Sequence, residues 1–143
     1  MISAKIGYWP SQADFQIKAL NAWIALNENR NDEALQLMRA AADAEEAADK
    51  HPVTPGNVVP SRQLLGEMLL AAGQPQQALL EFERSLKRDP NRFRAIYGAA
   101  RSAEAVGNRP LARDYYSRLL AQASDRDSER PELVQAAAFV AMQ

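Results

Sequence analysis

Acidic residues on an alanine-rich stretch are the first candidates for chemistry, because two carboxylates in one site are the least that hydrolysis by acid–base catalysis requires. Four acids lie close together there: Asp43, Glu45, Glu46 and Asp49. The residues between them are mostly alanines, whose small side chains offer little apolar surface to desolvate a carboxylate. We therefore expect these acids to have a structural role.

The sequence contains few residues that could bind a metal ion or act as a covalent catalyst. Asp125, Asp127 and Glu129 alternate as in a calcium loop, but the glycine and the closing glutamate of such a loop are missing. The single histidine, His51, is placed to cap a helix end or to pack beside Pro52 rather than to bind a ligand. No cysteine is present, which excludes disulfides, thiolate zinc sites and cysteine nucleophiles. We expect no metal, no cofactor and no enzymatic activity.

The charge distribution favours a macromolecular partner only locally. The chain of 143 residues has a net charge of −1, but residues 52–110 carry eight bases and five acids. The bases that cluster there are Arg84, Lys87, Arg88, Arg92, Arg94 and Arg101. They suit either an acidic or phosphorylated partner or a solvated helix face. Aromatic residues are not interleaved with them, so nucleic acid is not an expected partner.

No apolar run approaches 18 residues, and the first residues lack a charged-then-apolar leader. We therefore expect neither a membrane span nor a signal peptide, and by default a cytoplasmic protein.

The elements that position these side chains are expected to be helices. The chain contains 27 alanines and only 7% aromatic residues, which favours closely packed helices over strands. Residues 59–92 and 93–126 align at an offset of 34, with small residues, turn glycines and large side chains in the same order. The matched pairs are Gly66 with Ala100, Gly73 with Gly107, Ala78 with Ala112, Phe82 with Tyr116 and Leu86 with Leu120. A weaker third copy lies upstream, where Ala22 matches Gly66 and Asn29 matches Gly73.

Each copy predicts two helices joined by a tight turn. We expect a first helix that Ser11 and Asp14 open with a capping box, and a second that Asn31 or Asp32 caps and that runs to about Lys50. Gly73 and Gly107 are expected to end helices, and Pro75 and Pro110 to start the helices that follow. A last helix should open at Pro131, with Leu133, Ala137 and Val140 on the face that covers the preceding helices.

The segment from Arg62 to Asn91 resembles a tetratricopeptide repeat (TPR), the 34-residue helix–turn–helix unit. Its landmarks are Gly66, Leu69, Gly73, Ala78, Phe82, Leu86 and Pro90. The following copy matches through Ala100, Gly107, Ala112, Tyr116 and Leu120, but has Ser124 where proline is usual. The stretch from Asp49 to Leu70 also resembles segments near the C-terminal end of larger, uncharacterised bacterial TPR proteins.

The resemblance implies an all-α fold: a right-handed α–α superhelix of three helical hairpins plus a C-terminal capping helix. As a single domain, residues 1–143 divide into repeat 1 at about 11–50, an insert at 51–59, repeat 2 at about 60–92, repeat 3 at about 93–123 and the capping helix at about 131–142.

The resemblance further implies a non-catalytic scaffold that binds a peptide or a protein in a concave groove lined by the first helix of each pair. The groove residues would be Trp23, Gln63, Glu67, Arg94, Tyr97, Arg101 and Glu104. Trp23 is equally compatible with a place in the core. The Lys/Asn set by which some TPR proteins hold a C-terminal carboxylate is absent, since Ala19 and Trp23 stand at its first two positions.

Two alternatives remain. Met1 to Trp9 is apolar for a chain terminus, so it covers the first pair or contacts a second copy in a homodimer. In the second alternative, the chain is an oligomerisation or regulatory module that is part of a larger bacterial protein.

Overall fold

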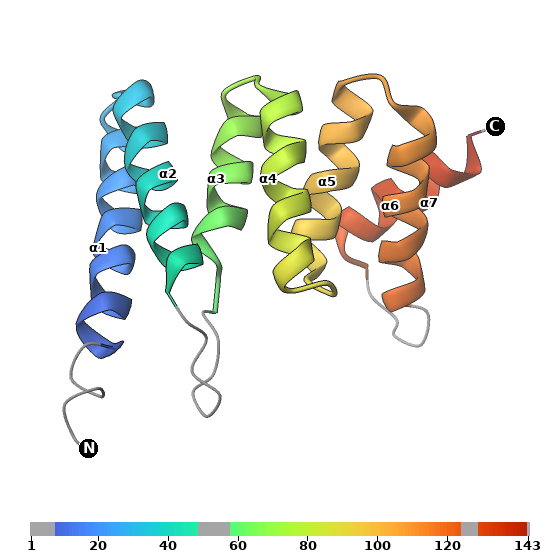
Figure 1. Cartoon of the computed structure of the whole chain (residues 1–143). Coiled ribbons are helices and arrows are strands. Elements are labelled where there is room, and N and C mark those ends of the chain that lie inside the picture. The colour runs from blue at the N-terminus through green and yellow to red at the C-terminus, as the bar shows by residue number, and fades with distance from the viewer. Residues whose placement is uncertain (1–7, 49–57, 124–128, 143) are drawn as a thin grey trace, which may run out of the picture. The chain divides into compact units, whose positions relative to one another are not determined.

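The computed structural model describes residues 8–48, 58–123 and 129–142, and these ranges contain seven α-helices and no strand (Figure 1). The helices are α1 (Tyr8–Asn27), α2 (Asn31–Ala47), α3 (Ser61–Ala71), α4 (Pro75–Arg88), α5 (Phe93–Ala105), α6 (Arg109–Gln122) and α7 (Pro131–Ala141). They form two compact units, Met1–Met68 and Leu69–Gln143, which are described separately. The expected all-α class is confirmed.

In the first unit α1 packs against α2 through small residues. Ala22, Ala25 and Ala34 are completely buried, and the larger Phe15 and Met38 are buried with them. Alanine at these positions lets two helix backbones approach closely, and the two large side chains fill the remaining space. This use of Ala22 agrees with its expected place among the small repeat residues.

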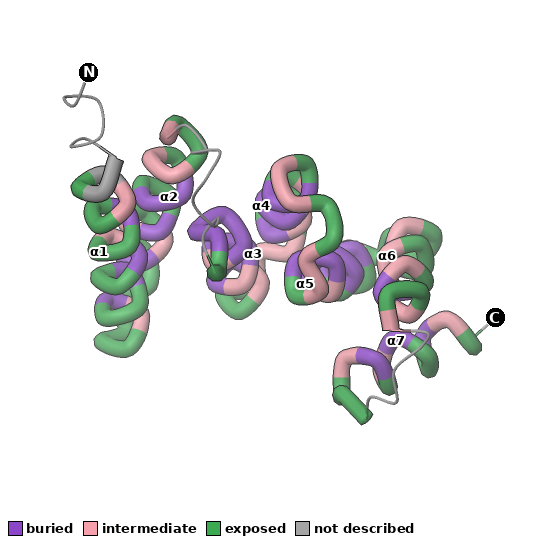
Figure 2. The backbone as a smooth tube through the Cα atoms, turned by 90° about the horizontal axis from the view of Figure 1, so that it is seen from below, coloured by how far each residue is buried: buried purple, intermediate pink, exposed green. Residues whose placement is uncertain are grey.

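In the second unit each helix from α4 to α7 packs against the next one. The buried Phe82 of α4 meets α5 at Gly98, where a Cβ atom would overlap the phenylalanine ring. In Figure 2, buried and exposed stretches alternate along the helices, as expected for helices that keep one side open to solvent.

The three tight turns share one geometry. Asn29, Gly73 and Gly107 have φ angles of 60°, 72° and 80°. The next residue of each turn donates its backbone N–H to the carbonyl five positions earlier, always at 2.9 Å: Arg30 to Ala25, Gln74 to Leu69 and Asn108 to Ala103. This is the Schellman ending of a helix, which needs a residue that tolerates a left-handed backbone. Asparagine tolerates it better than other non-glycine residues, so Asn29 occupies the first turn.

Three details of the expected helices are wrong. Helix α1 begins at Tyr8, so Ser11 lies inside it and does not cap it. Pro10 is accepted in that first turn because the first amides of a helix need no partner within the helix. Helix α2 ends at Ala47 instead of about Lys50, and its N-cap is Arg30, which makes no side-chain capping bond.

The buried face of α7 also differs from the expected one. Leu133 is buried as expected, but Ala137 is exposed and Val140 is only half-buried. The face continues instead through Ala136 and Phe139. The reason is the aromatic contact of Phe139 with Tyr116 of α6, whose ring centroid lies 4.9 Å away, because this contact sets the rotation of the helix.

Candidate functional site

Four of the expected binding residues lie on one face of α5, which we call the α5 face: Arg94, Tyr97, Arg101 and Glu104. Their spacing of three and four residues places them on the same side of the helix. Arg94, Arg101 and Glu104 are exposed and Tyr97 is half-buried. The guanidinium of Arg101 lies over the Tyr97 ring, 5.9 Å from its centroid, which is the geometry of a cation–π contact.

Hydrogen bonds to side chains of α6 and α7 orient Tyr97 and Glu104 of the α5 face. The Tyr97 hydroxyl donates to Oε1 of Gln135 on α7 at 2.6 Å, and Nε2 of Gln135 donates to the Tyr116 hydroxyl at 3.2 Å. The Tyr116 hydroxyl then donates to Oε2 of Glu104 at 2.8 Å. Tyr97 and Glu104 therefore have fixed orientations before any partner binds.

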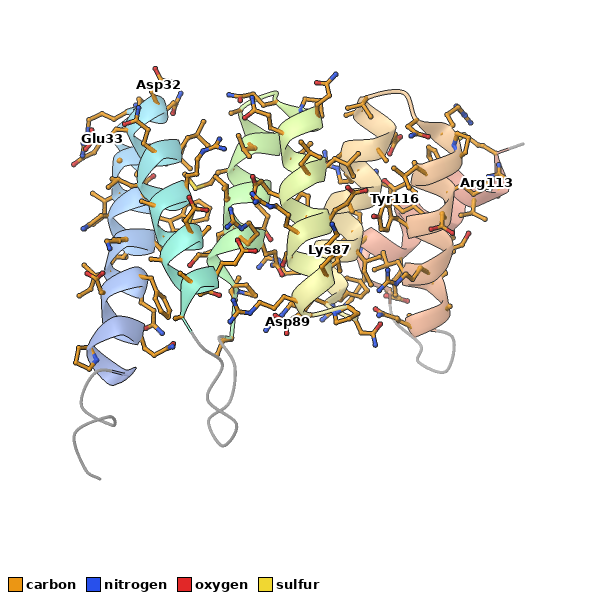
Figure 3. All side chains as sticks on the ribbon, in the orientation of Figure 1. Asp32, Glu33, Lys87, Asp89, Arg113 and Tyr116 are labelled. Atoms are coloured by element: carbon orange, nitrogen blue, oxygen red, sulfur yellow. The ribbon has the colours of Figure 1, made fainter. Side chains whose placement is uncertain are left out.

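The pKa of Tyr116 is raised well above its usual value, mainly by burial and secondly by the hydrogen bond to Glu104. The phenol is thus neutral at physiological pH and acts as a hydrogen-bond donor to the carboxylate. Figure 3 labels Tyr116, whose ring lies on the α5 side of α6. The arrangement can orient polar groups, but it contains no activated nucleophile.

Helix α7 is attached to the rest of the second unit at three further points. Arg109 lies 5.4 Å from the centroid of Phe139, and Arg130 lies 5.0 Å from that of Phe93. Arg113, labelled in Figure 3, donates to the carbonyl oxygen of Met142 at 2.7 Å. These contacts keep Gln135 in position, and through it the Tyr97 side chain.

The three remaining expected binding residues belong to the first unit. Trp23 on α1 is 39% exposed, so it lies at the surface and outside the core. Gln63 on α3 is only 2% exposed, and its amide donates to Oε1 of the half-buried Glu67 at 3.0 Å. Gln63 is therefore placed to orient Glu67 and offers almost no surface of its own.

The acids of α2 hold α3 in place. Arg62 is buried, and its Nη2 donates to Asp43 at 2.8 Å and to Glu46. Glu45 accepts the backbone N–H of Ser61, the first residue of α3, at 2.9 Å. A carboxylate at a helix N-terminus satisfies an amide that has no partner within the helix. The structural role expected for these acids fits this geometry, but Arg62 was not expected, since its partners lie 16 and 19 residues away in the sequence.

The basic cluster of the second unit is partly matched by acids. Arg84 lies 3.7 Å from Glu81, and Arg92 lies 3.7 Å from Asp89. Lys87 is exposed on α4, where Figure 3 labels it. The cluster is thus a mixed-charge surface, in which acids already offset part of the positive charge.

Several expected features lie outside the described residues: Asp49, His51, Asp125, Asp127 and residues 1–7 of the apolar segment Met1 to Trp9. Glu129 is described and exposed. Within the described ranges, no group of three or more histidine or acidic side chains is placed to hold a metal ion. Among the same residues, every helix is too short or too polar to cross a bilayer.

No family model and no curated protein sequence matches the chain. Among solved structures, the chain is similar to the crystal structure of PcrH from Pseudomonas aeruginosa, with a TM-score of 0.67 and 16% sequence identity. The match covers 90% of this chain and 89% of that one. This likeness extends over nearly all of both molecules, and it shows that the seven helices of the described residues have a TPR-like fold.

Proposed function

We propose that the chain is a non-catalytic protein-interaction scaffold that binds a peptide or protein segment on the exposed face of α5. The observation that carries this proposal is the α5 face, where Arg94, Tyr97, Arg101 and Glu104 lie side by side. Tyrosine and arginine are among the residue types that contribute most to binding energy in protein interfaces.

The rigidity of the α5 face supports the proposal. Tyr97 is held by Gln135, and Arg101 is held over the Tyr97 ring. A side chain that is already ordered loses little entropy on binding, which otherwise costs about 0.5–1.5 kcal/mol for each flexible side chain. The two arginines favour a partner segment with a carboxylate or phosphate near an apolar side chain.

The first unit carries expected binding residues of its own. Trp23 offers a partly exposed aromatic ring, and Glu67 offers a carboxylate that Gln63 orients. Gln63 itself acts through Glu67, because it is buried.

The test is the selection of binding peptides from a random displayed library, followed by calorimetric titration of the best synthetic peptide. We expect Arg94→Ala and Arg101→Ala each to weaken binding by about tenfold, which corresponds to about 1.4 kcal/mol. Lys87→Ala is the matched control, since it removes an exposed charge from α4, outside the α5 face. Unchanged affinity in both arginine variants contradicts the proposal, as does a library that yields no binder.

A second role, as an oligomerisation or regulatory module of a larger bacterial protein, is supported by one observation. Helix α1 exposes several large apolar side chains, among them Ile17, Leu20 and Ile24. Such a surface on a helix is suited to contact with another helix.

A further inference from the structure

Helix α1 is apolar on two opposite sides. One side carries the buried Phe15, Ala22 and Ala25. The other side carries Ile17, Leu20 and Ile24, which we call the α1 stripe; Leu20 is 59% exposed and its two neighbours are similarly open to solvent. The spacing of three and four residues places the α1 stripe on one line along the helix, with no charged residue at its positions. A soluble helix normally turns polar residues to this side.

The repeat shows which residues of α5 are equivalent to the α1 stripe. The Schellman turns align Asn29 with Gly107, an offset of 78. At that offset the α1 stripe corresponds to Ala95, Gly98 and Ser102 of α5, which are all buried. Gly98 is the residue that the Phe82 ring of α4 contacts. The α1 stripe therefore corresponds to three buried positions of α5, one of which contacts the helix that precedes it.

Helix α7 exposes a second apolar line. Val134 is 61% exposed, and Ala138 and Ala141 are exposed with it; we call these three residues the α7 stripe. The covered side of α7, through Leu133 and Ala136, aligns with Ala95 and Gly98 of α5 at an offset of 38. At the same offset the α7 stripe corresponds to three residues that are buried in α5: Ile96, Ala100 and Ala103.

The two stripes are complementary in size. The α1 stripe consists of isoleucine and leucine, whereas the α7 stripe consists of alanine and one valine. Large side chains of one helix pack well into the shallow surface that small residues leave on another, as Phe82 does on Gly98. Neither stripe has a charge to desolvate, and both have the length of two helical turns.

We propose that the α1 stripe of one molecule docks on the α7 stripe of a second copy of this chain. The contact covers both stripes, whose equivalent positions in α5 are all buried. It joins two different surfaces, so each added molecule leaves one stripe of each kind open, and the assembly grows with concentration. This inference does not rest on the proposed peptide binding, because the α5 face takes no part in it.

Sedimentation velocity of the whole chain over a wide range of concentrations tests the contact. We expect the average mass to rise with concentration for the natural sequence. Leu20→Glu and Ala138→Glu each place a charge in one stripe at an exposed position, so each variant should fold, as circular dichroism would verify, and remain a monomer. Leu80→Glu is the matched control, since Leu80 of α4 is 60% exposed and belongs to neither stripe; it should assemble like the natural chain.

A mixture of the two stripe variants gives the decisive result. Leu20→Glu retains an intact α7 stripe and Ala138→Glu retains an intact α1 stripe, so together they should form a heterodimer of one copy each and nothing larger. A natural chain that stays monomeric at all concentrations overturns the proposal, and so does a mixture that stays monomeric. Self-association of Ala138→Glu alone overturns it too, because it indicates pairing of α1 with α1.

Discussion

The two units use the same helix–turn–helix geometry with different side-chain chemistry. The first unit packs alanines between α1 and α2 and attaches the start of α3 through a buried arginine that two exposed acids hold. The second unit packs aromatic rings, with Phe82 against Gly98 and Phe139 against Tyr116, and links α5, α6 and α7 through hydroxyl and amide groups.

This difference shows that the repeat specifies positions and leaves the residue types free. Gly98 of the second unit and Leu20 of the first occupy equivalent positions, yet one is buried under a phenylalanine and the other is 59% exposed. The burial of a repeat position depends on which helix lies beside it. The following predictions test the contrast between the two units.

The largest effect is expected from the aromatic contact of the second unit. Phe82→Ala removes a completely buried ring, and we expect the free energy of unfolding to fall by about 3–5 kcal/mol. Leu20→Ala at the exposed position of the first unit should change it by less than about 0.5 kcal/mol. Chemical denaturation of both variants measures the contrast, and equal losses would show that the two positions are not distinguished by burial.

In the ion pairs of the first unit, removing the acids should lower the free energy of unfolding more than removing the arginine. The double variant Asp43→Asn, Glu46→Gln removes the negative charge of both acids that pair with the buried Arg62 guanidinium, and we expect a loss of about 3 kcal/mol. Arg62→Met should cost less, because the two acids it leaves behind are exposed to water and methionine restores the apolar packing. Denaturation curves check this order, and the reverse order would contradict it.

The turns of the two units should respond differently to substitution of the residue with the left-handed backbone. Gly107→Ala forces a residue with a Cβ into a left-handed backbone, and we expect a loss of about 1–2 kcal/mol. Asn29→Gly in the equivalent turn should be neutral or slightly stabilising, since glycine accepts that φ angle without strain. Thermal unfolding of the two variants is the measurement; a clear loss in Asn29→Gly would mean that the asparagine side chain has a further role.

Alkaline pH should weaken the second unit. Burial and the nearby Glu83 raise the pKa of Tyr115 from 10.0 to about 12. Between these two values the unfolded chain loses the phenolic proton while the folded chain keeps it, so stability falls as the pH rises through this window. Tyr115→Phe should flatten the fall, as circular dichroism together with phenolate absorbance would record. An identical pH profile for the variant would exclude Tyr115 as a cause.

The smallest effect is expected from the surface of α1. Asp14 accepts from Lys18 at 2.6 Å, one helical turn apart and exposed to solvent. Asp14→Ala should lower the free energy of unfolding by less than about 0.5 kcal/mol, and high salt should remove the difference. If denaturation at low salt showed a loss of unfolding free energy above about 1 kcal/mol, this ion pair would be important for the stability of the fold.

Features that depend on neighbours in the chain were predictable, and features that depend on distant residues were not. The repeat located the turns at Asn29, Gly73 and Gly107 because a left-handed backbone restricts the residue type at one position. It also indicated Phe82 and Tyr116 as large core residues. The rotation of α7 was predicted incorrectly, since an aromatic contact with another helix decides it.

For the candidate surface, the resemblance to the TPR family implied Arg94, Tyr97, Arg101 and Glu104, and their spacing of three and four residues puts them on one side of a helix, because helical periodicity is a local property. Only the tertiary structure decided that Gln63 is buried, that Gln135 holds Tyr97 and that Arg62 gathers the acids of α2. Such contacts join residues 16 to 38 positions apart, and side chains at that separation meet only once the helices have packed.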